Sequence, residues 1–223
     1  MNINKNLKDY ALVIFDWDGT LMDSISRIVS SMQSAARSCE LIVPSKDKAK
    51  SIIGLSLAVG IKKLFPTLSE EGLDKMLTEY KYQYLEGDTT PSPLFENSLN
   101  LLTALKKDQR KLAVATGKAR PGLQRIFDVT GAEHYFDASC CAGEVLSKPA
   151  PDMLLRILAE LDITADQAVM IGDTSYDMQM AKSAGVDRIG ITLGVDTRAV
   201  LNEYQPVAVV DSISELQQLL LPE

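Results

Sequence analysis

The feature that most constrains this chain is an uninterrupted apolar stretch, residues 11–15, that runs directly into Asp16 and Asp18. Continuous apolar strands usually belong to parallel sheets that are covered on both faces. Because side chains alternate along a strand, Asp16 and Asp18 can share one edge while Trp17 points into the packing behind them. Open α/β sheets bind ligands at the carboxyl ends of their strands, so this pattern predicts a site rather than a solvated turn.

From residue 94 onward, helical segments alternate with short apolar strands. The predicted strands lie at residues 111–116, 138–142, 168–172, 188–192 and 207–210. Strands separated by helices imply right-handed crossovers and a parallel sheet. We therefore predict an α/β fold, a Rossmann-like parallel sheet flanked by helices, built from residues 1–22 and 94–223.

Residues 23–93 show a different pattern. Apolar residues recur at helical spacing in 25–36, 57–65 and 73–84, and no convincing alternating strand pattern interrupts them. This block follows the first strand directly, so we expect an inserted α-helical cap domain that acts as a lid over the Asp16 edge.

Residues typical of helix starts support these assignments. Ser24 precedes the first helix of the insertion and can cap it. Thr164 with Gln167, and Ser212 with Glu215, have the spacing of capping boxes. The second pair is expected to open the final helix.

Composition limits the functions that are open to the chain. With 223 residues, of which 46% are hydrophobic, it can bury a sizeable core. A net charge of −7 disfavours nucleic-acid partners. The odd set Cys39, Cys140 and Cys141 favours reduced, mostly buried thiols. There is no signal core and no segment long enough to span a membrane, so we expect a cytoplasmic protein without a membrane partner.

Three further strand ends or loops carry polar residues. One has Thr116 and Gly117, another has Lys148, and a third has Asp173 and Asp177 directly after a strand. In a parallel sheet these ends lie along one edge, where they meet the first two aspartates. Lys118 and Arg120 come next to this group. Either could reach a phosphate, but we expect both to be exposed at a helix start.

The residue types are complementary. Several carboxylates cannot be ionised together without a counter-charge. Mg²⁺ suits them because it binds through one or two carboxylates plus a substrate phosphate. Lys148 supplies a positive charge, and Thr116 with the Gly117 amide supplies hydrogen-bond donors. The set fits a phosphate held between a metal and a lysine, with a carboxylate free to attack phosphorus.

The four motifs, in this order between Asp16 and Asp177, resemble those of the haloacid dehalogenase superfamily. A helical insertion after the first motif is similar to its C1-capped, phosphoglycolate phosphatase-like branch. The resemblance implies that Asp16 is the nucleophile and forms an aspartyl-phosphate. It implies that Asp18 is the general acid and then the base, and that Thr116 and Lys148 bind and stabilise the phosphoryl group.

The same resemblance implies a metal site. Asp173 would bind Mg²⁺ together with the Asp16 carboxylate and the Asp18 main-chain carbonyl. Asp177 would support the metal through water or position Lys148.

Two details point to hydrolysis of phosphate esters. Asp18 is present, whereas dehalogenating and phosphonate-cleaving members generally lack that acid, and the residues that follow are similar to hydrolytic members. Gly117 replaces an Asn that phosphoglycolate-type members often carry, so the substrate stays open. We expect a small, anionic phosphorylated metabolite and a monomer or weak homodimer. A phosphomutase, or a non-catalytic phosphate-binding protein that keeps the fold, is the alternative.

Overall fold

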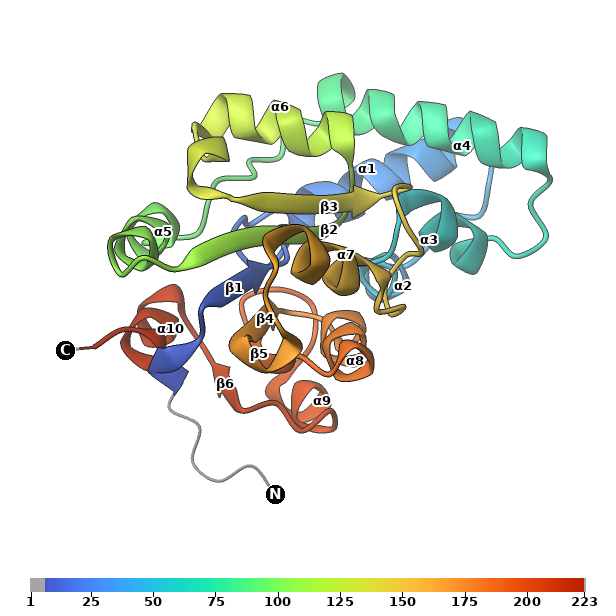
Figure 1. Cartoon of the computed structure of the whole chain (residues 1–223). Coiled ribbons are helices and arrows are strands. Elements are labelled where there is room, and N and C mark those ends of the chain that lie inside the picture. Colours follow the sequence, from blue (N-terminus) through green and yellow to red (C-terminus); the bar gives the residue numbers. More distant parts are fainter. Residues whose placement is uncertain (1–6, 223) are drawn as a thin grey trace.

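The computed structural model describes residues 7–222, and its centre is a parallel β-sheet. Within these residues the sheet has six strands in the order β3-β2-β1-β4-β5-β6 (Figure 1). The strands are β1 (Leu12–Phe15), β2 (Lys111–Ala119), β3 (Ala138–Ala142), β4 (Ala168–Gly172), β5 (Asp187–Ile191) and β6 (Ala208–Val210). The predicted Rossmann-like parallel sheet is confirmed.

Strand β1 lies at the centre of the sheet, and its side chains alternate between two core layers. Val13 and Phe15 join the cluster that covers one face of the sheet. The helices of that face are α5 (Ser98–Lys107), α6 (Arg120–Thr130) and α10 (Ile213–Leu220). All four side chains of β1 are buried, which explains why the strand reads as a continuous apolar run.

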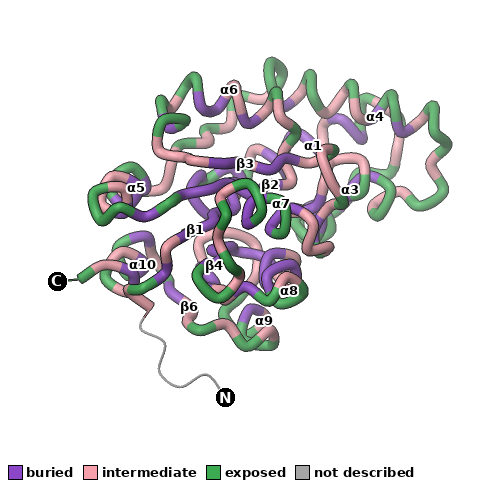
Figure 2. The backbone as a smooth tube through the Cα atoms, viewed as in Figure 1, coloured by how far each residue is buried: buried purple, intermediate pink, exposed green. Residues whose placement is uncertain are grey.

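The opposite face of the sheet packs against a second set of helices. Leu12 and Ile14 of β1 join this cluster, to which α7 (Asp152–Leu161) and α8 (Ser175–Ala184) contribute buried apolar residues. The short helix α9 (Arg198–Asn202) contacts α8 and β5. Figure 2 shows the purple, buried segments concentrated on the strands and on the inward sides of these helices.

The segment between β1 and β2 is helical, as the spacing predicts. It contains α1 (Ile25–Ser38), α2 (Lys46–Lys50), α3 (Leu57–Leu64), α4 (Glu70–Tyr82) and a π-helical turn, Gln83–Gly87. These helices have an apolar cluster of their own, and in Figure 1 α1, α3 and α4 lie together at one end of the molecule. The boundaries at residues 22 and 94 stay a prediction.

The two chain crossings into and out of this helical segment lie side by side. Met22 forms an antiparallel bridge with Leu94. The Asp23 N–H donates to the Pro93 carbonyl at 2.8 Å. Both connections are therefore held together at the base of the insertion.

Several local predictions have clear outcomes. The Ser212 hydroxyl accepts from the Glu215 N–H at 3.1 Å, so the cap of the final helix is confirmed. The prediction for Thr164 is wrong: a 3₁₀ turn follows it, and its hydroxyl donates to the Gln167 side chain instead of accepting from the backbone. Trp17 is fully buried and packs edge-on against Phe127 with ring centroids 5.4 Å apart.

The three cysteines are free, with Cys140 and Cys141 buried and Cys39 partly exposed. In the part of the chain that the structure describes, none of the helices combines the length and apolar character that crossing a membrane requires.

Candidate active site

A buried lysine and a buried aspartate form the centre of the site. Asp16 follows β1, and its N–H donates to the Ile171 carbonyl of β4 at 2.9 Å, which fixes it at the sheet edge. Lys148, from the loop between β3 and α7, places its Nζ 2.8 Å from Asp16 Oδ1 and 2.6 Å from Asp177 Oδ1. Burial alone would lower the pKa of Lys148, but the two carboxylates outweigh it and raise that pKa.

Three carboxylates gather beside this lysine. Among the described residues, one oxygen from each of Asp16, Asp173 and Asp177 lies within 4.8 Å of the others, and all three residues are buried. Burial raises the pKa of Asp16 to about 7, with Asp177 adding to the effect and Lys148 opposing it. Burial, and then the charges of Asp16 and Asp177, raise the pKa of Asp173 well above its usual range. If all three carboxylates were ionised, the cluster would carry more negative charge than the ammonium of Lys148 neutralises.

These residues fit a divalent cation. The donor set consists of oxygens, which hard cations such as Mg²⁺ prefer. Asp16 Oδ1 also makes no hydrogen bond of ordinary geometry within the described residues, although Lys148 Nζ is close to it. The gathered carboxylates include Asp177 and not the side chain of Asp18, whose predicted contribution to the metal is its main-chain carbonyl.

Two glycines and a threonine set the position of Asp173. The Thr20 hydroxyl donates to Asp173 Oδ1 at 3.0 Å, and the Val195 N–H donates to Oδ2 at 2.9 Å. A Cβ on Gly19 or on Gly194 would lie within 2.3 or 1.8 Å of Oδ2, so the backbone approaches the carboxylate where no side chain fits. Our sequence reasoning missed Thr20, although it belongs to the first motif.

Asp177 joins the start of α8 to the lysine. Its Oδ2 accepts from the Thr174 N–H at 3.1 Å and from the Thr174 hydroxyl at 2.6 Å, which completes a capping box. Its Oδ1 accepts from Lys148. A helix cap thereby orients the carboxylate that holds the lysine.

Asp18 is held apart from the carboxylate cluster by two partners. Its Oδ1 accepts from the Ser24 hydroxyl at 2.7 Å, and its Oδ2 lies 3.1 Å from Lys118 Nζ.

This geometry corrects two predictions made from the sequence. The Ser24 side chain makes no capping hydrogen bond to α1, because it is turned to Asp18. The Lys118 side chain is only 11% exposed, because it pairs with Asp18.

The sequence carried a signal for Lys118 that we did not use. It stands two residues after Thr116 at the end of a strand, where residues two apart share a face. Thr116 is itself buried at the end of β2, and its hydroxyl accepts from the Lys118 N–H at 3.2 Å. Arg120, in contrast, pairs with Glu144 at 2.8 Å on another part of the surface.

At Gly117 the insertion approaches the sheet closely. A Cβ at this position would lie 2.5 Å from the Leu55 carbonyl oxygen and 2.8 Å from that of Gly54. Beside it, the Ser56 N–H donates to the Ser147 hydroxyl at 3.0 Å. The loop before α3 therefore contacts the loops that carry the site.

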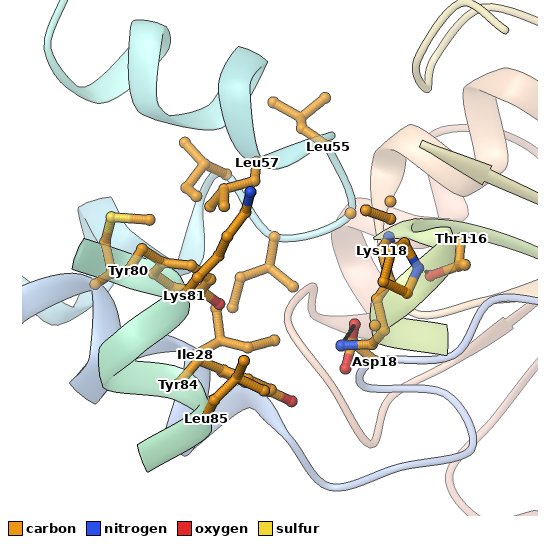
Figure 3. Close-up of a pocket in the computed structure, with 18 of the residues that line it drawn as sticks. Asp18, Ile28, Leu55, Leu57, Tyr80, Lys81, Tyr84, Leu85, Thr116 and Lys118 are labelled. Carbon is orange, nitrogen blue, oxygen red and sulfur yellow. Dashed lines mark hydrogen bonds and ion pairs between the residues drawn. The ribbon is translucent and has the colours of Figure 1, made fainter. Parts of the chain in front are cut away.

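A cavity of about 340 Å³ lies between the insertion and the sheet edge. This volume is in the range of small-molecule sites. In Figure 3, Asp18, Thr116 and Lys118 lie on one side of it, opposite residues of the insertion. Tyr80 and Tyr84 both line the cavity, and their stacked rings have centroids 5.9 Å apart.

Known proteins with similar sequences indicate the family of this chain. A family profile described as haloacid dehalogenase-like hydrolase matches residues 13–191. "Probable phosphatase IndB" from Dickeya dadantii is 32% identical over 209 residues, covering 92% of this chain and 91% of that protein.

Two more similarities cover almost the whole chain. The tyrosine-protein kinase PtkA of Mycobacterium tuberculosis is 32% identical over 94% of this chain and 72% of its own length. The crystal structure of a haloacid dehalogenase-like hydrolase from Bacteroides fragilis superposes with a TM-score of 0.86 at 25% identity, covering 93% of this chain and 99% of that one. The chain belongs to the haloacid dehalogenase-like hydrolase family.

Proposed function

We propose that this protein is a Mg²⁺-dependent phosphatase that hydrolyses a phosphate monoester of a small molecule through a phospho-aspartate on Asp16. The observation that carries the proposal is the pairing of two differently held aspartates at one cavity. Asp16 is buried against Lys148, while Asp18 stands beside it with Ser24 and Lys118 as partners. The family and the phosphatase among the relatives support the same reaction class.

In the first step, a carboxylate oxygen of Asp16 forms a bond to phosphorus as the bond to the leaving-group oxygen breaks. Asp18 gives its proton to that oxygen, so the alcohol leaves neutral. In the second step, Asp18 takes a proton from water, and the resulting hydroxide attacks phosphorus. Inorganic phosphate leaves, and the Asp16 carboxylate is restored.

Neighbouring groups hold the charge that develops on the phosphoryl oxygens. Lys148 stays charged beside Asp16, and Thr116 with the Gly117 N–H offers donors at the end of β2. Asp16, Asp173 and the Asp18 carbonyl would hold Mg²⁺, with Asp177 supporting it. The bound ion would neutralise phosphate charge and act as a Lewis acid.

We further propose that residues 1–22 and 94–223 form the catalytic core and that residues 23–93 form a cap. Two features support this division: the insertion has an apolar cluster of its own, and the segments that enter and leave it are bridged to each other. We also propose a cytoplasmic monomer or weak homodimer without nucleic-acid or membrane partners; the net charge of −7 disfavours nucleic acid.

The two alternatives to a phosphatase are a phosphomutase and a non-catalytic binder. A binder would gain nothing from a buried nucleophile whose neighbour Asp18 is positioned by its own hydrogen bonds. A mutase would return the phosphoryl group to the bound alcohol, so it would release no inorganic phosphate.

The test is phosphate release from a panel of small phosphate esters, with and without Mg²⁺. Asp16→Asn should lower turnover at least a thousandfold, because an amide is a poor nucleophile. The matched control is Asp74→Asn, which changes an exposed aspartate on α4 and should leave turnover unchanged. Full turnover in Asp16→Asn would contradict the role of Asp16, and metal-independent turnover would contradict the role of Mg²⁺.

A further inference from the structure

The cavity at the active site has two ends of different character. Its sheet side carries the polar groups described above. Its insertion side is lined mainly by apolar side chains from α1, from the loop before α3 and from α3 itself: Ile28, Met32, Ile52, Ile53, Leu55 and Leu57. Figure 3 shows Ile28, Leu55 and Leu57 around one side of the space, and Asp18 with Lys118 across from them.

Three cations also line the cavity: Lys118, Lys81 and Arg125, whose buried Nε has no hydrogen-bond partner among the described residues. Lys118 is paired with Asp18 at 3.1 Å. The Arg125 guanidinium lies 5.9 Å from the ring centroid of Tyr84, within the range of a cation–π contact. Lys81 is an exposed residue that also lines the cavity. The apolar wall itself offers no charge to a leaving group that lies against it.

This distribution decides which leaving groups are favoured. A carboxylate placed against the apolar wall would lose its hydration without gaining a hydrogen bond, and that loss is costly. A methylene placed there gains roughly fourfold in affinity from the removal of its surface from water. A leaving group that lies against this wall is therefore favoured when it is apolar rather than anionic.

We propose that the substrate is a phosphate monoester whose leaving group is predominantly apolar, an alkyl chain or a ring that fills the insertion side of the cavity. The proposal rests on the proposed function, because it takes the Asp16 end of the cavity as the place of the phosphate. In this proposal the cap recognises the leaving group of the substrate by apolar contact rather than by charge.

The binding test uses n-alkylphosphonates, which keep the phosphate-like head and cannot be hydrolysed. Calorimetry in Mg²⁺ should show affinity rising about three- to fourfold per methylene from ethylphosphonate to hexylphosphonate. Phosphonoacetate, with a carboxylate in place of an apolar chain, should bind more weakly than propylphosphonate. Affinity that is independent of chain length, or tighter binding of phosphonoacetate, would overturn the proposal.

A pair of variants locates the effect. Leu85, in the π-helical turn of the insertion, also belongs to the apolar lining of the cavity and is 45% exposed. Val59 on α3 is also 45% exposed but does not line the cavity. Leu85→Gln should reduce the preference for hexylphosphonate over ethylphosphonate at least threefold, while Val59→Gln should leave it unchanged. Equal effects of the two substitutions would contradict the assignment of the apolar wall.

Turnover of the matching alkyl phosphates separates this proposal from the proposed function. If hexylphosphonate binds more tightly and no alkyl phosphate is hydrolysed, the apolar recognition stands and the phosphatase proposal fails. If esters are hydrolysed without any gain from chain length in binding, the phosphatase proposal stands and the apolar recognition fails.

Discussion

Ser24 illustrates how one hydroxyl is assigned to the site instead of to a helix. Ser24 lies immediately before α1, but its side chain donates to Asp18 at 2.7 Å and makes no capping hydrogen bond to the helix. A hydrogen bond to a charged group contributes about 1.5–3 kcal/mol. Removing it should leave Asp18 less well oriented for proton transfer, with little effect on the helix.

We therefore expect Ser24→Ala to lower kcat about tenfold or more and to lower the free energy of unfolding by about 1–3 kcal/mol, because the buried hydrogen bond to Asp18 is lost. Steady-state kinetics and urea unfolding would measure the two effects. Ser26→Ala is the matched control, because Ser26 is exposed on the same helix. Normal kcat in Ser24→Ala would show that the hydroxyl contributes to stability alone and does not orient Asp18 for catalysis.

Single residues also show what the sequence could and could not reveal. Asp16 and Asp173 were predictable as neighbours because strand ends of a parallel sheet share one edge. Lys118 was misplaced, since helix starts are usually solvated and its partner Asp18 lies a hundred residues away in the sequence. Hydrogen bonds from Thr20 to Asp173 depend on loop conformation, which spacing alone does not determine.

At the scale of elements, the strands were predictable and their irregularities were not. The apolar strands fall where the pattern places them, but β2 extends to Ala119 because its pairing with β3 shifts after Thr116 and resumes there. A π-helical turn follows α4 and carries Tyr84 and Leu85 toward the cavity. Such turns have no periodic signature of their own, since they are single insertions into helical spacing.

The contact between the insertion and β2 at Gly117 can be tested by a substitution. A methyl group at this position would meet the Leu55 carbonyl, so Gly117→Ala should push the loop before α3 away from the site. We expect KM to rise about tenfold, with the sheet and its core still folded. Gly72→Ala is the control, because the atoms nearest the added methyl group would belong to the side chains of Leu68 and Ser69 and not to the backbone. Unchanged KM in Gly117→Ala would contradict a cap that closes through this contact.

At the scale of the whole molecule, the buried carboxylates make folding depend on pH and on the metal. In the folded protein burial raises the pKa of Asp16 to about 7, above its ordinary value of 3.8. The folded state then binds more protons than the unfolded state between these values, so stability falls as pH rises from about 4 to 7. Asp173, whose pKa is also raised, acts in the same direction.

A cation among these carboxylates should reverse the trend, because binding requires their ionised forms and releases protons. With EDTA present, we expect the free energy of unfolding to decrease by a few kcal/mol between pH 5 and pH 7.5. Saturating Mg²⁺ at pH 7.5 should restore about 3 kcal/mol when it exceeds its Kd a hundredfold. Urea unfolding at several pH values, with EDTA or Mg²⁺, would measure both effects.

Asp173→Asn gives the matching comparison, because it removes one raised carboxylate and one proposed ligand together. The decrease in stability with rising pH in EDTA should become smaller, and the stabilisation by Mg²⁺ should largely disappear. The exposed Asp74→Asn variant should keep both behaviours of the unmodified protein. Equal stabilisation by Mg²⁺ in the two variants would place the metal elsewhere in the molecule and leave the carboxylate cluster without its proposed cation.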